Sequence, residues 1–480
     1  MKNMTLANIA KACGGIYHGS DEDYTKVVEG VSLDSRQIEK NWLFVATKGE
    51  RVDGHSFIPQ VAEKGALCVI SEKELTQIKE CSDICVNYIL VKDSFQALKD
   101  LAEFYLAQLQ VKVVGITGSV GKTSTKEMIA GVLSEHYNVL KTAGNFNNEV
   151  GLPLTIFRLR EEHEVAVLEM GISDFGEMHR LAKIAKPDIA VITNIGQCHL
   201  ENLGDRNGIL RAKTEIFDEM KANGEVVLNG DDDKLSSIQS VHGKTPYFFQ
   251  KVHCSDWTVQ EQGAADSEHV IYADCIVNRG LKGTQCLIHV QRDGQFVSFV
   301  ADINVPGEHQ VNNALAATSV GLLLGLSTDE IAAGIRKVVP ISGRTNLIET
   351  ENYTLVDDCY NANPVSMKAA LDLLATANTR KVAVLGDMFE LGTDSDRLHR
   401  EVGSYGASLS IDVICMIGEN SRHMYEGAKE KAGSQKKLYY FTDKQQFLHN
   451  MGEVLTKGDT ILLKASHGME FGVLLEQLSK

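Results

Sequence analysis

Hydrophobic positions in residues 1–108 form short apolar runs followed by one stretch of helical spacing. The runs are β-like and lie at 42–46, 67–70 and 88–91. In residues 94–108 the apolar positions recur at intervals of three and four, which is typical of an amphipathic helix, and Ser94 is its expected N-cap. The pattern predicts a small mixed α/β domain.

The pattern changes at Val111, where a strand-like apolar run leads into a glycine-rich turn. Further runs typical of strands lie at 164–169, 188–193 and 226–228. A more polar, β-rich stretch at 245–305 precedes helical patterns at 311–324 and 328–338. Because strands that alternate with helices indicate a parallel sheet, we predict a central α/β domain over residues 109–338.

Residues 339–480 repeat the alternation of strands and helices. The strand-like runs lie at 354–356, 381–385, 413–417 and 460–463. This arrangement is typical of an open, doubly wound Rossmann-like sheet. The predicted fold class is therefore α/β with three domains.

Composition agrees with this division. The chain has 480 residues, which suggests about three domains at roughly 150 residues each. Hydrophobic residues make up 43% and charged residues 23%, which excludes a disordered chain, a collagen-like fibre and a polytopic membrane protein. Apolar runs such as 320–326 are too short to cross a bilayer, and no signal-peptide core stands at the start. The ten cysteines form no C-x-x-C pair and indicate a reducing compartment, so we expect a cytoplasmic protein without membrane insertion. The sequence does not determine the oligomeric state, for which a monomer is the favoured expectation.

The formal net charge of −16 narrows the choice of partners. An acidic surface repels nucleic acid over most of its area, so neither DNA nor RNA is expected to bind. If the ligand is a small anion, a few cationic side chains must gather locally to hold it.

The strongest chemical signal is the segment 113–125, VVGITGSVGKTST, in which a strand leads through a glycine-rich turn into a helix. Backbone N–H groups of such a turn cradle phosphate oxygens. Lys122 would reach the β and γ phosphates, and the Thr123 hydroxyl would bind Mg²⁺. Ile116 replaces the first glycine of the general pattern, so the match is to the narrower T-G-x-x-G-K-T. The predicted nucleotide-binding residues are Gly118, Ser119, Val120, Gly121, Lys122, Thr123 and Ser124.

Two further residues stand at predicted strand ends. Glu169 ends the run 164–169, and His199 lies just past the run 188–193. Carboxyl ends of parallel strands face ligands, which makes both residues candidate metal ligands. Each alone is more typical of a solvated loop, but the phosphate loop favours the functional interpretation.

Motifs continue along the whole chain. Beside the phosphate loop they include NFNNEVGLPLT, LEMG, TNIGQCHLENLG, AKTEIF, PGEHQVNNALAA and SGR. In this order they resemble the Mur ligase family, the ATP-dependent amide ligases of bacterial peptidoglycan synthesis. VDDCYNANPVSMKAAL and LGDMFELG are similar to motifs of the members that add D-Ala-D-Ala to UDP-MurNAc-tripeptide. DSRQIEKNWLFVATKG and DGHSF resemble the family's uridine-nucleotide domain.

The resemblance implies a mechanism and its cofactors. ATP would phosphorylate the tripeptide carboxylate, and the amine of D-Ala-D-Ala would attack the acyl phosphate, giving UDP-MurNAc-pentapeptide, ADP and phosphate. Two Mg²⁺ ions are implied, the second held by Glu169 and His199. Lys213 matches the family position where a lysine is carbamylated, which would turn a cation into a metal-bridging anion.

The adenosine side of the nucleotide is implied in the same way. Asn313 would face adenine, and Gln310 stands where the family has another asparagine. Asn312 is interpreted as a helix residue that packs on the core.

Other family positions map onto the last part of the chain. Arg344 in SGR would reach the γ phosphate, and Asp358 would accept a hydrogen bond from the ribose, with Asp357 as the alternative. His467 replaces an arginine of the family pattern, so a permanent charge becomes a titrating one.

The remaining implied residues concern the two substrates. In the first domain, the residues expected around the uracil and diphosphate are Ser35, Arg36, Lys48, Asp53 and His55. The other expected substrate residues are Asn147, Asn148, Asn361, Asn363 and Asp387, of which the last three would lie near D-Ala-D-Ala.

Two other classes stay open. A folylpolyglutamate synthase would share the central domain but should lack the first-domain and DDCYNANP motifs. A P-loop switch NTPase would need a base-reading N-K-x-D, where this chain has the segment 193–196, TNIG. The sequence determines neither the third peptide residue (L-lysine or meso-diaminopimelate) nor the base that deprotonates the incoming amine.

Overall fold

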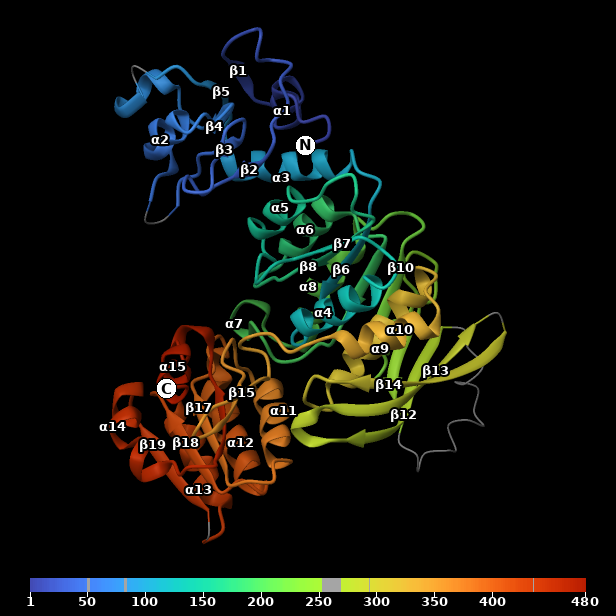
Figure 1. The fold of residues 1–480 in the computed structure, drawn as a ribbon, viewed down its shortest axis with the longest axis vertical. Coiled ribbons are helices and arrows are strands. Elements are labelled where there is room, and N and C mark those ends of the chain that lie inside the picture. Colours follow the sequence, from blue (N-terminus) through green and yellow to red (C-terminus); the bar gives the residue numbers. More distant parts are fainter. Residues whose placement is uncertain (50–51, 82–83, 253–268, 293, 435) are drawn as a thin grey trace.

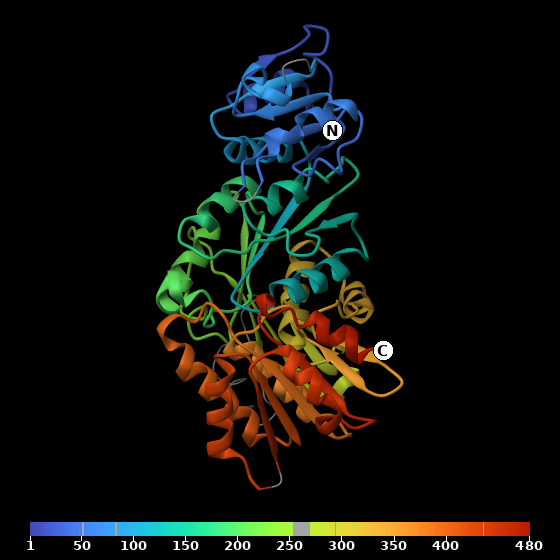
Figure 2. The ribbon, with the colours of Figure 1, turned by 90° about the vertical axis from the view of Figure 1, so that its left-hand side faces the viewer.

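The computed structural model describes residues 1–49, 52–81, 84–252, 269–292, 294–434 and 436–480. Three β-sheets follow one another along the long axis of the molecule, each with its own helices (Figures 1 and 2). The parts that carry them are named here the first, second and third units. The predicted α/β fold class is confirmed. No helix among the described residues is long and apolar enough to cross a membrane.

The first sheet has the order β1-β5-β4-β3-β2 and is parallel except for the pairing of β1 with β5. Its strands are β1 (Ile16–His18), β2 (Val31–Ser32), β3 (Leu43–Val45), β4 (Cys68–Ser71) and β5 (Asn87–Leu90). Its helices are α1 (Leu6–Ala12), α2 (Ile58–Glu63) and α3 (Ser94–Leu106). The predicted cap of α3 is wrong by one residue, because the Asp93 carboxylate accepts from the Gln96 N–H and Ser94 is already helical.

The helix α3 joins the first and second units through a shared core. Its apolar residues Leu101 and Tyr105 belong to the same buried cluster as residues of the second unit, and the Tyr105 hydroxyl donates to the Leu159 carbonyl at 2.6 Å. The domain boundary near residue 108 remains a prediction.

The second sheet has nine strands in the order β14-β13-β12-β11-β10-β9-β6-β8-β7. It is parallel from β7 to β12 and antiparallel from β12 to β14. The strands are β6 (Lys112–Thr117), β7 (Val139–Lys141), β8 (Val165–Glu169), β9 (Ile189–Ile192), β10 (Glu225–Asn229), β11 (Tyr247–Lys251), β12 (Val270–Asn278), β13 (Thr284–Arg292) and β14 (Gln295–Ile303). Residues 253–268 of the predicted β-rich stretch lie outside the described residues.

Helices cover both faces of this sheet. Residues of α4 (Lys122–Leu133), α9 (Gln310–Leu323) and α10 (Thr328–Lys337) pack in the core on one face. The core on the other face includes residues of α5 (Gly151–Ile156), α6 (Glu177–Ala185) and α8 (Arg206–Thr214), and the short α7 (Leu200–Leu203) precedes α8.

The third sheet has the order β15-β16-β20-β17-β18-β19 and is parallel except for the pairing of β15 with β16. Its strands are β15 (Asn346–Glu349), β16 (Thr354–Asp357), β17 (Lys381–Gly386), β18 (Val413–Ile417), β19 (Lys437–Phe441) and β20 (Thr460–Lys464). One face packs α11 (Pro364–Ala375), α12 (Ser395–Ser408) and α13 (Ser421–Lys431), and the other packs α14 (Lys444–Val454) and α15 (Gly472–Leu478). The sheet is therefore doubly wound, as predicted.

Candidate active site

A cavity of about 1050 Å³ lies where the carboxyl ends of central strands of the second sheet meet the third unit. The second unit contributes the turn after β6 and the segments that follow β8, β9 and β10. The cavity brings together these predicted residues: Ser119, Val120, Gly121, Lys122, Thr123, Ser124, Asn147, Asn148, Glu169, His199, Asn313, Arg344, Asp358, Asn361 and Asn363.

The turn between β6 and α4 contains two glycines with positive φ angles. Gly118 has φ +148° and Gly121 has φ +82°, which glycine adopts without strain. A Cβ on Gly118 would also lie 1.9 Å from the Thr193 hydroxyl oxygen. Lys122, at the start of α4, donates to the Gly118 carbonyl at 2.8 Å. Ile116, which replaces the glycine of the general pattern, is buried in the core.

The segment 193–196 after β9 holds this turn in place. The Asn194 side chain accepts from the Val120 N–H and donates to the Val120 carbonyl, both at 3.0 Å. The Thr193 hydroxyl donates to the same carbonyl at 2.6 Å, and the Ser119 N–H donates to the Asn194 carbonyl at 3.0 Å. A switch NTPase would read its base from this strand end, whereas here the polar groups support the turn.

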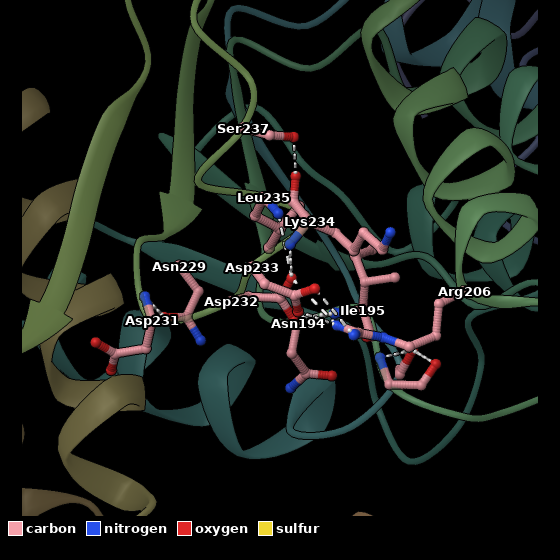
Figure 3. Close-up of polar contacts among 12 residues, drawn as sticks. Asn194, Ile195, Arg206, Asn229, Asp231, Asp232, Asp233, Lys234, Leu235 and Ser237 are labelled. Carbon is pink, nitrogen blue, oxygen red and sulfur yellow. Dashed lines mark hydrogen bonds and ion pairs between the residues drawn. The ribbon is translucent and has the colours of Figure 1, made fainter.

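Asp232 and Arg206 form a clamp on the backbone of the segment 193–196 (Figure 3). The Ile195 N–H donates to Asp232 Oδ2 at 2.7 Å, and the Ile195 carbonyl accepts from Arg206 Nε at 2.8 Å. The other Asp232 oxygen accepts from the N–H groups of Lys234 and Leu235. The sequence motifs missed this clamp, although an acidic run directly after the apolar strand β10 was an available signal.

We expect Asp232→Asn to lower the free energy of unfolding by about 1–3 kcal/mol, because an amide nitrogen facing the buried Ile195 N–H leaves that donor unpaired. The Asp232 side chain is 8% exposed. The KM for ATP should rise as the supported turn loosens. Urea unfolding and steady-state kinetics measure both effects. Asp233→Asn is the matched control, because that side chain is 65% exposed and its ion pair with Arg206 contributes little. Equal effects of the two variants would contradict the clamp.

Glu169 ends β8 as a buried carboxylate with one oxygen unused. Its side chain is 2% exposed, and Oε1 accepts from Asn147 Nδ2 at 2.8 Å. Oε2 is buried and has no hydrogen-bond partner among the described residues. Burying such an oxygen is costly unless a cation or donor pairs with it.

These surroundings fit Mg²⁺ held together with nucleotide phosphates. The Thr123 hydroxyl at the start of α4 lines the same cavity as Glu169. The described residues hold no group of three or more His, Cys, Asp or Glu that could bind a metal alone. Mg²⁺, however, is usually bound by one or two carboxylates plus substrate phosphates, so the donor set is suitable.

Of the two other predicted metal ligands, His199 and Lys213, only the first lines the cavity. His199 lines the cavity, and its Nδ1 lies 2.7 Å from Glu390 Oε2 of the third unit. Lys213, in α8, is 1% exposed and is not among the residues that line the cavity. Burial lowers the pKa of Lys213 to about 8; the nearby Cys198 opposes this effect and the charge of Lys122 adds to it.

Arg344 links the third unit to the phosphate-binding turn. Its guanidinium carbon lies 3.9 Å from the centre of the Tyr360 ring, a cation–π contact. Its Nη2 donates to the Thr123 hydroxyl at 3.3 Å. The third unit therefore places a cationic side chain beside the start of α4, and its contact with a γ phosphate stays a prediction.

The two neighbouring aspartates after β16 have different roles. Asp357 is fully buried and accepts from the Gly343 N–H at 2.6 Å, so it shapes the turn that carries Arg344. Asp358 lines the cavity, and Lys464 Nζ donates to its Oδ2 at 2.6 Å. This difference favours Asp358 over Asp357 as a residue that faces a ligand.

On α9 the amide groups are arranged differently from the expectation. Asn313 reaches the cavity wall, but its Oδ1 accepts from the Thr125 hydroxyl at 2.7 Å and its Nδ2 donates to Gln310 at 2.7 Å. Asn312 also lines the cavity, and its buried Oδ1 has no partner among the described residues. The interpretation of Asn312 as a core residue is therefore wrong.

Of the three residues predicted to lie near D-Ala-D-Ala, only two line the cavity. Asn361 and Asn363 line the cavity, and Asn363 also caps α11. Asp387 is 4% exposed, does not line the cavity, and accepts from the N–H and hydroxyl of Ser421. The His467 ring lies against Tyr360, with ring centres 5.6 Å apart and a tilt of 40° between the ring planes.

The predicted uridine-site residues lie in the first unit, away from the cavity lining. Arg36 and Lys48 are exposed, whereas Ser35 is buried. His55 is buried between Asp53 and the N–H of Glu72, which follows β4, so both ring nitrogens have partners within the first unit. Although burial opposes it, hydrogen bonds from Lys73 and His55 hold the pKa of Asp53 well below its usual range.

Comparisons with known proteins agree with this geometry. Three family models match: the Mur ligase family catalytic domain over 27–106, the Mur ligase middle domain over 116–321, and the Mur ligase glutamate ligase domain over 343–467. The chain belongs to the Mur ligase family.

Relatives and solved structures cover nearly the whole chain. The UDP-N-acetylmuramoyl-tripeptide--D-alanyl-D-alanine ligase of Bacillus subtilis (strain 168) is 37% identical over 100% of this chain and 99% of its own length. MurF from Acinetobacter baumannii superposes with a TM-score of 0.85 at 31% identity, covering 99% of this chain and 98% of that one. MurF ligase from Thermotoga maritima, solved with ADP, gives a TM-score of 0.77 at 29% identity over 94% and 97% of the two chains.

Proposed function

We propose that the chain is an ATP-dependent ligase that joins D-Ala-D-Ala to UDP-MurNAc-tripeptide in peptidoglycan precursor synthesis. The observation that carries this proposal is the cavity in which a phosphate-binding turn and the unpaired Glu169 oxygen meet Arg344 of the third unit. The similarity to UDP-N-acetylmuramoyl-tripeptide--D-alanyl-D-alanine ligases over 88–100% of the chain favours these substrates over those of a folylpolyglutamate synthase.

The reaction must make a carboxylate electrophilic before an amine can attack it. Phosphorylation by ATP gives an acyl phosphate, and attack by the D-Ala-D-Ala amine then releases phosphate and forms the amide bond. Negative charge develops on phosphoryl oxygens in the first step. Lys122, the start of α4 and Arg344 line the cavity, and they would supply the cationic and donor groups with which a preorganised site stabilises such charge.

Thr123 would hold the Mg²⁺ of the γ phosphate, and Glu169, His199 and a carbamylated Lys213 would hold a second ion. When bound, Mg²⁺ neutralises charge on phosphoryl oxygens and polarises them. Asp358 would bind the ribose. Asn312, with its unpaired oxygen, joins Asn313 as a candidate for the adenine amino group.

Each end of the molecule would bring one further substrate. The exposed Arg36, before β3, and Lys48, after β3, would bind the uridine diphosphate. The contact between Asp53 and His55 would keep the loop that carries Lys48 in shape. Asn361 and Asn363, with Asn147 and Asn148 opposite, would bind around the reacting peptide ends. We place this chemistry in the cytoplasm, where ATP is made available, and expect a monomer, because one chain brings residues for all three substrates.

Phosphate release measured with UDP-MurNAc-tripeptide, D-Ala-D-Ala and ATP tests the proposal. We expect release that requires both peptide substrates, with L-lysine and meso-diaminopimelate forms of the tripeptide compared side by side. Release that depends instead on glutamate and a folate would overturn the assignment.

Arg344 offers a test of the contact between units. We expect Arg344→Lys to lower kcat by about 10–100-fold, because lysine keeps the charge but loses the planar stacking on Tyr360 and the forked donors. Arg336→Lys, on the helix α10, is the control. Retention of wild-type kcat by Arg344→Lys would show that a point charge suffices there.

A further inference from the structure

The contact between His199 and Glu390 joins the second unit to the third. His199 Nδ1 lies 2.7 Å from Glu390 Oε2, and the two side chains are 21% and 58% exposed. Exposed ion pairs of this kind contribute little to stability. The contact nevertheless has structural support on both sides, which points to a role other than stability.

Both partners have unusual backbone conformations. His199 has φ +51° and Glu390 has φ +62°, in the left-handed region that non-glycine residues rarely adopt. Such strain persists where the surrounding structure enforces it, and it gathers at functional sites.

The loop that carries Glu390 is held by hydrogen bonds at the two residues before it, Met388 and Phe389. The Met388 N–H donates to Nε2 of the buried His399 at 2.9 Å, and the Phe389 N–H donates to the Ser466 hydroxyl at 2.9 Å. These bonds fix the backbone from which the Glu390 carboxylate extends.

The helix that follows His199 packs against the same loop. Leu200, the first residue of α7, contacts the buried core of the third unit, which includes Leu391. A Cβ built on Gly392 would lie 3.6 Å from the Glu201 Cα. Figure 1 shows α7 beside the third unit. The side-chain contact is thus part of a packed junction.

We propose that Glu390 is a positioning residue that holds the His199 imidazole with its proton on Nδ1, leaving the Nε2 lone pair for a metal ion at the cavity. Histidines that bind metals usually donate their other ring N–H to a carboxylate in this way. The inference rests on the proposed Mg²⁺-dependent ligase function. The inference gives the LGDMFELG motif a role, because Glu390 lies in it. The third unit, which is expected to bind D-Ala-D-Ala, would thereby also orient His199, a metal ligand of the second unit.

Mn²⁺ binding to the full chain tests the inference without reference to turnover. Free Mn²⁺ is measured by electron paramagnetic resonance with a saturating non-hydrolysable ATP analogue. We expect Glu390→Ala to weaken a Mn²⁺ site about tenfold, as loss of a supporting carboxylate does elsewhere. The Mn²⁺ affinity of Glu390→Gln should fall between those of the wild type and Glu390→Ala, because the glutamine carbonyl can still accept from Nδ1–H of His199. Asp394→Ala, which removes an exposed acid of the same segment, should bind Mn²⁺ like the wild type.

A double variant separates positioning from a general effect. In a His199→Ala background, Glu390→Ala should cause no further loss of Mn²⁺ affinity, because the two residues act through one ligand. An additive loss would overturn the inference. The inference would also be overturned if Glu390→Ala kept the wild-type Mn²⁺ affinity but showed a larger radius of gyration in solution scattering. Glu390 would then only hold the second and third units together. If the wild type bound no Mn²⁺ with the nucleotide, the proposed function itself would fail.

Discussion

Lys122→Ala is expected to lower kcat/KM for the ligase reaction by about 10³-fold, the cost of removing one charge-stabilising group from a preorganised site. The Lys122 ammonium is held 2.8 Å from the Gly118 carbonyl, and Lys122 lines the cavity together with the turn that precedes it. Because the protein has a net charge of −16, its overall electrostatic field repels an anionic ligand and cannot compensate for the loss of this cation. Phosphate release with both peptide substrates measures the effect.

Lys112→Ala is the matched control for this prediction. Lys112 lies at the opposite end of the same strand, β6, and its side chain is 63% exposed beside Asp188. We expect wild-type activity and an unchanged melting temperature for the control. A Lys122→Ala enzyme that keeps kcat/KM within tenfold of the wild type would remove the turn from the phosphate-binding role.

The sequence predicted the strands that are buried on both faces, because these form continuous apolar runs. β8, β9, β17, β18 and β20 all appear within a residue or two of their expected bounds. Edge strands were missed: β7 has three residues, and β15, with the sequence Asn346–Glu349, is half-exposed and antiparallel. An edge strand faces solvent on one side, so it lacks the apolar run on which the prediction depends.

The candidate site could be predicted where a motif carries its own chemistry. Lys122 and Glu169 were found in this way, and the cavity brings them together. The contact of Asp232 with Ile195 joins distant segments, so the acidic run 231–233 does not by itself show which residue it binds. Polar residues inside a motif were also ambiguous: Asp387 was expected to face a ligand, yet its oxygens bind the start of α13. Whether a side chain serves a ligand or its own loop is decided by tertiary packing.

Lys213→Ala is expected to abolish ligase activity and to regain at least a tenth of it on addition of a short-chain carboxylic acid. The side chain is buried in α8, so its removal leaves space that a small carboxylate can enter. The ammonium first loses one proton, and the neutral amine then joins CO₂ with loss of a second proton, so that a cation becomes an anion. Burial favours the neutral amine, since it lowers the pKa of Lys213 to about 8.

Lys126→Ala is the matched control, because Lys126 is equally buried but its ammonium donates to the Thr142 carbonyl at 2.7 Å and pairs with Glu127. A lysine whose role is to donate hydrogen bonds as a cation cannot be replaced by a carboxylic acid, so no rescue is expected for that variant. Mass measurement of the intact wild type under native conditions should show the added mass of one CO₂, absent from Lys213→Ala. Lack of rescue together with an unmodified Lys213 would leave a buried ammonium behind the cavity, and Glu169 and His199 would then have to bind the second metal ion without an anionic third partner.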